Sequence, residues 1–203
     1  MASALRLEPD QMVAGRDFTD PACTVADLAA LASIRRSLAD RLRTSARGGA
    51  WSDAVGSHWL VVPDRDALAR AQPAVGVGFF GLARTDVDHA PILRLEQQLL
   101  SRASAFPGLL AYHNVRFASG QWGNLVLFAG DESPAHVRED AVHLEALART
   151  PAHYESIRLH RLHLPGGVLD GAPATLLWTL LIDLSETPPW RAVRGTDLPD
   201  RDR

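Results

Sequence analysis

The stretch LLAYHNVRFASGQWGNLVLFA, residues 109–129, predicts two antiparallel strands, residues 109–117 and 122–129, joined by a tight hairpin. If Ser119 and Gly120 form a two-residue turn, Phe117 pairs with Trp122 and every other side chain points to the same face. That face then carries an apolar, aromatic-rich set with one imidazole and one carboxamide: Ala111, His113, Val115, Phe117, Trp122, Asn124, Val126 and Phe128. A loop one residue longer or shorter would change the pairing of the two strands. The Trp122 side of the second strand would then lie beside the other side of the first strand, which carries Tyr112, Asn114 and Arg116.

The segments around this hairpin predict an α+β fold. The run VGVGFFGLA, residues 75–83, reads as a buried strand whose glycines leave room for a close-packed helix or a ligand. Asp88 and Pro91 open a helix that ends before residue 106, and Ser133 and Pro134 open a second helix that Thr150-Pro151 interrupts. Strands follow at residues 157–164 and 175–184. The order strand, helix, strand, strand, helix, strand predicts a ferredoxin-like split βαβ antiparallel sheet, with one strand appended.

The two ends of the chain are predicted to lie outside that unit. Residues 1–22 have no period and read as an extended arm, and Thr24 with Asp27 begins a helix that runs to Arg43. Residues 188–203 are rich in Pro, Arg and Asp and predict a tail. The sequence thus divides into an N-terminal arm and helical extension (1–74), a ferredoxin-like α+β barrel domain (75–187) and a C-terminal tail (188–203).

Composition excludes several classes of function. The net charge of −3 gives no reason to expect nucleic acid or a membrane surface as partner, and no run is apolar enough for a signal peptide or membrane span, so a cytoplasmic protein is expected. All 21 basic residues are Arg, which excludes lysine Schiff-base chemistry and a P-loop lysine. Cys23 is the single cysteine, so no internal disulfide can form. Hydrolase, zinc-protease and dinucleotide-binding motifs are missing from the sequence.

The predicted order of elements and the segment EALARTPAH, residues 145–153, resemble the antibiotic biosynthesis monooxygenase-like families of the dimeric α+β barrel superfamily. Those families carry a His, two residues, Ser-Pro signature, to which Thr150-Pro151 corresponds, while Leu147 stands at the histidine position. The resemblance covers residues 75–164. It implies a homodimer whose sheets face each other, with an apolar cavity between the sheet and the helices of each subunit. Some members of the superfamily oxidise aromatic substrates without a cofactor and others bind or degrade haem.

The hairpin face supplies the candidate catalytic residues. His113 would act as general base, because imidazole titrates near neutral pH, Asn124 would stabilise an oxyanion and Trp122 would stack on a flat ring. The alternative is that His113 and Asn124 only satisfy each other inside a core. Candidate ligand-binding residues are Phe80, Phe117, Phe128 and His143.

The second helix also raises metal and haem binding. His136, Asp140 and His143 lie along one side of it, a stripe that could ligate a metal but that more often faces solvent, and no metal is predicted. His143 is the best candidate for a haem ligand if a cofactor binds at all.

The leading hypothesis is therefore an enzyme acting on an apolar or aromatic small molecule, either a cofactor-independent monooxygenase or a cyclase of secondary metabolism. The alternatives are a non-catalytic small-molecule or haem-binding protein with the same cavity, and a purely structural homodimer.

Overall fold

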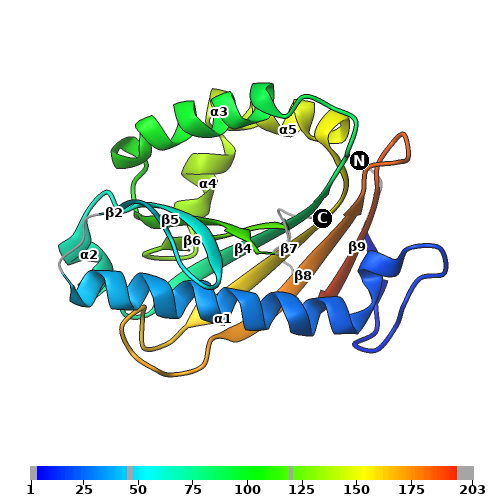
Figure 1. Ribbon diagram of the computed structural model, residues 1–203. Coiled ribbons are helices and arrows are strands. Elements are labelled where there is room, and N and C mark those ends of the chain that lie inside the picture. The colour runs from blue at the N-terminus through cyan, green and yellow to red at the C-terminus, as the bar shows by residue number, and fades with distance from the viewer. Residues whose placement is uncertain (1–3, 45–47, 119–120, 196–203) are drawn as a thin grey trace.

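A computed structural model describes residues 4–44, 48–118 and 121–195. The strands form one mixed, nine-stranded sheet in the order β1-β9-β8-β7-β4-β6-β5-β3-β2, in which only β1 and β9 run parallel (Figure 1). Their bounds are β1 Leu5–Leu7, β2 Gly48–Ser52, β3 Gly56–Val61, β4 Ala74–Ala83, β5 Leu109–Phe117, β6 Trp122–Phe128, β7 Tyr154–Leu164, β8 Thr175–Asp183 and β9 Trp190–Gly195.

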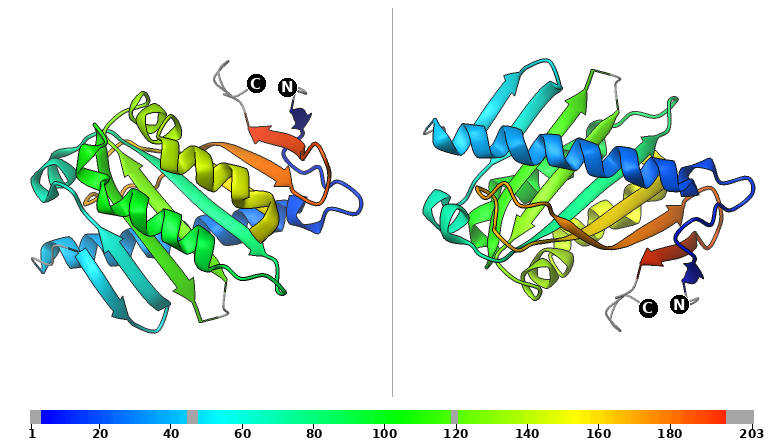
Figure 2. Two further views of the ribbon diagram at one scale, coloured as in Figure 1. Left: turned by 90° about the horizontal axis from the view of Figure 1, so that it is seen from above. Right: turned by 90° about the horizontal axis from the view of Figure 1, so that it is seen from below.

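Helices cover both faces of this sheet. The long α1 crosses one face, while α3, α4 and α5 arch over the other, as the views in Figures 1 and 2 agree. The helices are α1 Pro21–Arg43, α2 Arg65–Arg70, α3 Ala90–Ser101, α4 Ser133–Arg138 and α5 Ala141–His153, with short 3-10 turns at Asp17–Thr19 and Ala103–Ala105. None of the helices in the described part of the chain is both long and apolar enough to span a membrane.

The α+β class is confirmed, and the elements between residues 74 and 164 follow the predicted order. The sheet is larger than that of a ferredoxin-like fold, because five further strands extend the four central ones, which lie in the order β7-β4-β6-β5. Three of these strands, β1 to β3, belong to the segment expected as an N-terminal arm and helical extension, in which the sequence predicts a strand only at residues 58–62, within β3 and just after it. Residues 190–195 were expected in a tail but form β9, because their backbone pairs with both β1 and β8. Residues 196–203 lie outside the described part.

Helix α1 packs along the sheet through one apolar side. It begins at Pro21 rather than at Thr24, because the Asp20 side chain accepts a hydrogen bond from the Ala22 N–H and caps the helix. A Cβ built on Gly78 of β4 would lie 2.5 Å from Leu31 Cδ1. Gly78 of β4 therefore makes room for a helix, one of the two predicted alternatives. The core on this side contains Leu31, Ile34, Leu38, Leu42, Leu60, Phe80, Leu125, Leu127 and Leu162.

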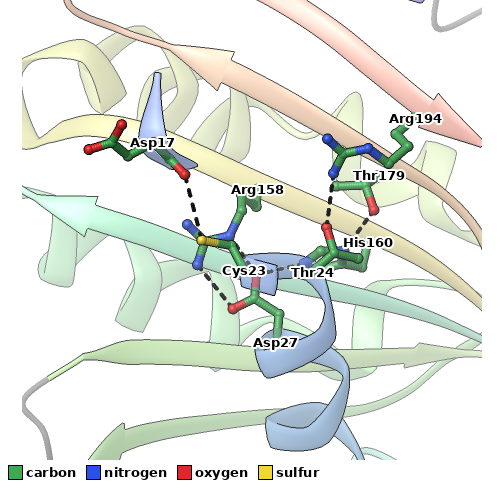
Figure 3. A network of polar contacts seen from close by, with 8 residues as sticks. All are labelled: Asp17, Cys23, Thr24, Asp27, Arg158, His160, Thr179 and Arg194. Carbon is green, nitrogen blue, oxygen red and sulfur yellow. Dashed lines mark hydrogen bonds and ion pairs between the residues drawn. The ribbon is translucent and has the colours of Figure 1, made fainter. Parts of the chain in front are cut away.

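A buried ionic contact fixes the N-terminal half of α1 to the sheet (Figure 3). Asp27 accepts hydrogen bonds from Arg158 Nε at 2.6 Å and Arg158 Nη2 at 3.0 Å, and its Oδ2 lies 2.9 Å from His160 Nε2. His160 Nδ1 in turn lies 3.0 Å from the hydroxyl oxygen of Thr179 on β8. Burial acts to lower the pKa of Arg158, but its hydrogen bonds and attraction to Asp27 outweigh this and raise that pKa. The contact thus joins α1, β7 and β8.

The position of α1 bears on the expected homodimer. The resemblance implies two subunits whose sheets face each other. Here α1 of the same chain covers the sheet face away from α3 and α5 (Figure 1), and Ile34 and Leu38 are fully buried there. Pairing of two sheets through this face would require α1 to leave. Homodimerisation itself stays a prediction.

Candidate functional site

A large cavity separates the sheet from α3 and α5. Its volume is about 1320 Å³, and it extends from β5 and β6 across β4 and β7 to β8 and β9. Helix α5 has a single buried residue, His153, because the side facing the sheet borders open space instead of side chains. The floor and roof are mostly apolar and include Val77, Phe79, Val126, Ile157, Leu159, Leu180 and Ile182 from the sheet, and Ile92, Leu99, Val142 and Ala146 from the helices.

The predicted hairpin register is wrong by one residue. Arg116, not Phe117, pairs with Trp122, and Asn114 pairs with Asn124. The Phe117 N–H donates to the Gln121 carbonyl at 2.9 Å, so three residues separate the last pair of the hairpin instead of two. Because side chains alternate along a strand, this change moves the whole set of β5 side chains to the other face. Two of the three residues, 119 and 120, lie outside the described part.

His113 therefore does not meet Asn124 and Trp122. It lies on the α1 side of the sheet, completely buried, with its Nε2 3.1 Å from His58 Nδ1. His58 Nε2 lies 2.9 Å from Asp53 Oδ1. Burial, followed by the neighbouring His58, lowers the pKa of His113 to about 3, so its imidazole stays neutral at physiological pH. His113 does not line the cavity, so it cannot act there as the general base.

The other expected site residues divide between the two faces. Phe80 and Phe117 lie on the α1 side, where Phe80 is part of the core and Phe117 packs against it. Trp122, Asn124, Phe128 and His143 line the cavity. The structure therefore brings together four of the seven residues chosen from the sequence, and the chemical role of each stays a prediction.

His143 lines the cavity from α5, the second of the two helices into which the predicted helix is divided. The predicted helix breaks between α4 and α5 at Glu139 and Asp140, not at Pro151, which lies within α5. The Asp140 side chain caps α5 by accepting from the Val142 N–H and pairs with Arg102 at 2.9 Å. Burial, the largest effect, lowers the pKa of His143, so the neutral imidazole is favoured. Among the described residues, no three His, Cys, Asp or Glu side chains gather closely enough to hold a metal ion. Haem binding through His143 stays a prediction.

A polar cluster, defined here as Glu96, Tyr112, Asn114 and Asn124, occupies the β5 and β6 end of the cavity. The Tyr112 hydroxyl donates to Glu96 Oε1 at 2.5 Å, and Asn114 Nδ2 donates to the same oxygen at 2.9 Å. Asn124 Nδ2 donates to the Tyr112 hydroxyl oxygen at 3.0 Å. Within the described part of the chain, Glu96 Oε2 has no hydrogen-bond partner. Asn124 Oδ1 is also buried without a hydrogen-bond partner, so the cluster leaves two oxygens for a ligand.

Burial controls the protonation of this cluster. Desolvation raises the pKa of Glu96, and the hydrogen bonds from Tyr112 and Asn114 offset part of this effect. Burial and the nearby Glu96 carboxylate raise the pKa of Tyr112 well above its usual value, so Tyr112 remains a neutral donor. The same two causes raise the pKa of Tyr154, which also lines the cavity, to about 12. A buried carboxylate that accepts hydrogen bonds from a neutral phenol and a carboxamide is suited to accept a proton from a bound molecule.

Glu96 and Tyr112 were not selected from the sequence, although a signal for Glu96 was present. The apolar side of the predicted helix is set by Ile92, Leu95 and Leu99, and Glu96 follows Ile92 by four residues on that side. A carboxylate within an apolar stripe is costly unless it is paired, and is therefore a candidate functional residue. Tyr112 could be chosen only with the correct hairpin register.

Comparison with known proteins does not identify a family for this chain. No family model matches it, and no curated protein matches it. One similar solved structure is that of a proposed monooxygenase from Lactobacillus acidophilus NCFM, with 12% sequence identity and a TM-score of 0.41. The alignment covers 53% of this chain and 51% of that protein. The chain therefore spans about half the length of that relative, and a similarity this low carries no argument about function.

Proposed function

We propose that this protein binds a large, mainly apolar organic molecule in the cavity between the sheet and α3 and α5, and removes a proton from it at Glu96. The observation that carries the proposal is the cavity itself, which ends at a buried, hydrogen-bonded carboxylate. Pockets for drug-sized ligands have volumes of about 300–1,000 Å³, are mostly apolar and carry a few placed polar groups. The cavity exceeds that range and has the same composition.

The chemistry follows from the arrangement of the polar cluster. Glu96 Oε2 would take a proton from an acidic C–H or O–H group of the ligand, and the electron pair would remain on the ligand. Tyr112 and Asn114 keep Glu96 Oε1 occupied, which fixes the orientation of the carboxylate. The Tyr154 hydroxyl has no hydrogen-bond partner in the described part of the chain, so it can donate to an oxygen on which negative charge develops. This is proton transfer on an apolar substrate, the reaction class proposed for the leading hypothesis, with Glu96 in place of His113.

Ligand binding can be measured without knowledge of the natural substrate. N-phenyl-1-naphthylamine is neutral, apolar and fluorescent in a dry environment, so the wild-type protein is expected to bind it and increase its emission. Leu159 lies on the cavity floor, and Leu159→Trp would fill part of the open space. This variant is expected to lose binding by at least about tenfold, because less apolar ligand surface can be buried.

Val25→Trp is the matched control, since Val25 is 67% exposed on α1, across the sheet from the cavity. It should bind the probe as the wild type does. Equal binding by the wild type and Leu159→Trp, in a folded variant, would remove the cavity as the binding site.

A further inference from the structure

The two ends of the cavity differ in charge. At the β5 and β6 end, the members of the polar cluster hydrogen-bond to one another. At the opposite edge, Arg191 on β9 borders the cavity, and Arg161 borders it from β7, nearer the middle of the sheet. The apolar floor between the two ends is continuous, because Ile182 pairs with both Arg191 and Ile157 in the register of the sheet.

Arg191 is available to a ligand. Its side chain is exposed, and within the described part of the chain it has no hydrogen bond or ion pair. Arg161 is only 11% exposed and donates to Asp131 at 2.9 Å, but the Asp131 side chain is 80% exposed, so that pair lies at the surface. Figure 2 (left) shows β9 lying beyond the edge of α5.

The length of the cavity follows from the strand order. Five neighbouring strand spacings separate β5 from β9, or about 24 Å at roughly 4.8 Å per spacing. A compact ligand would leave much of this apolar floor without contact, whereas an extended chain would cover it. A carboxylate at the β9 end would lie beside Arg191 and remain close to water, where an ion carries little desolvation penalty.

We infer that the ligand is an elongated amphiphile with a long hydrocarbon chain, whose carboxylate at one end binds at Arg191 and whose other end carries the acidic C–H or O–H group that reaches the polar cluster. This inference rests on the proposed function and narrows its substrate class. Affinity should increase with chain length, by about fourfold for each additional buried methylene.

The test compares a fluorescent long-chain fatty acid, cis-parinaric acid, with its methyl ester. The wild-type protein is expected to bind the acid about fivefold more tightly than the ester at low ionic strength, with the preference decreasing as salt is added. Arg191→Gln should abolish the preference and leave ester binding unchanged. Arg36→Gln makes the same change of charge on an exposed residue of α1, across the sheet from the cavity, and should retain the preference.

Equal affinity for acid and ester in the wild type, or a preference that survives Arg191→Gln, would overturn the inference while the cavity remains a binding site. If neither compound binds, the proposed function fails instead, so the two failures are distinguishable.

Discussion

Replacing Asp27 with alanine is expected to lower the free energy of unfolding by about 3–5 kcal/mol. The Asp27 side chain is 4% exposed, and those of Arg158 and His160 are 12% and 0% exposed. Removing the carboxylate would leave the Arg158 cation without its counter-ion in a site that water hardly reaches. Because Asp27 also anchors α1, its loss should weaken the layer that covers this face of the sheet. Chemical denaturation followed by circular dichroism measures the change.

Asp40→Ala is the matched control, since Asp40 lies on the same helix and pairs with Arg43. That side chain is 73% exposed, so the control should change stability by no more than about 0.5 kcal/mol. Asp27→Asn keeps the shape and removes the charge, and should fall between the wild type and Asp27→Ala. Similar losses for Asp27→Ala and Asp40→Ala would contradict the assignment of Asp27 as the anchor of α1.

Glu96→Gln is expected to lower the rate of proton removal in the cavity by about 100-fold or more, because the substitution removes the proposed base. A probe reaction that needs only a base is the ring opening of 5-nitrobenzisoxazole, a neutral aromatic compound. The base takes the ring C–H proton, the carbon–nitrogen bond gains the electron pair and the nitrogen–oxygen bond breaks to release a coloured cyanophenolate. Glutamine preserves an acceptor for Tyr112 and Asn114 but cannot take the proton.

The pH dependence of this reaction has a defined sign. Only the carboxylate form of Glu96 is a base, and burial raises its pKa, so the rate should increase with pH through a midpoint above the ordinary glutamate value of about 4.3. Glu145→Gln, a change at a half-exposed α5 residue paired with Arg149, should leave both rate and midpoint unchanged. A rate that persists in Glu96→Gln would assign the base to another residue.

The order of the central elements was predictable because it depends on local signals. Proline and acidic residues at the helix starts, apolar runs in the strands and the glycines of β4 each act within a few residues. Strands β1, β2 and β9 were missed. Strand β9 is short, begins beside prolines and pairs with β1 and β8. Pairing between segments so distant in sequence leaves little local signal.

The candidate site was harder to predict than the fold, because it depends on a single register. One residue in the loop between β5 and β6 decides whether His113 or Tyr112 faces the cavity. Asn124 and Phe128 lie on β6, so their orientation does not depend on β5, and both line the cavity. Glu96 reaches the cluster from α3, and its contact with Tyr112 joins residues from separate elements that only tertiary packing brings together.

The most direct test of the account is a crystal structure of the protein grown with N-phenyl-1-naphthylamine. Electron density for the compound is expected on the floor formed by Val77, Phe79 and Leu159, beneath α5. Density elsewhere on the protein, or helices α3 and α5 packed directly against these three side chains with no space between, would contradict the proposed binding site.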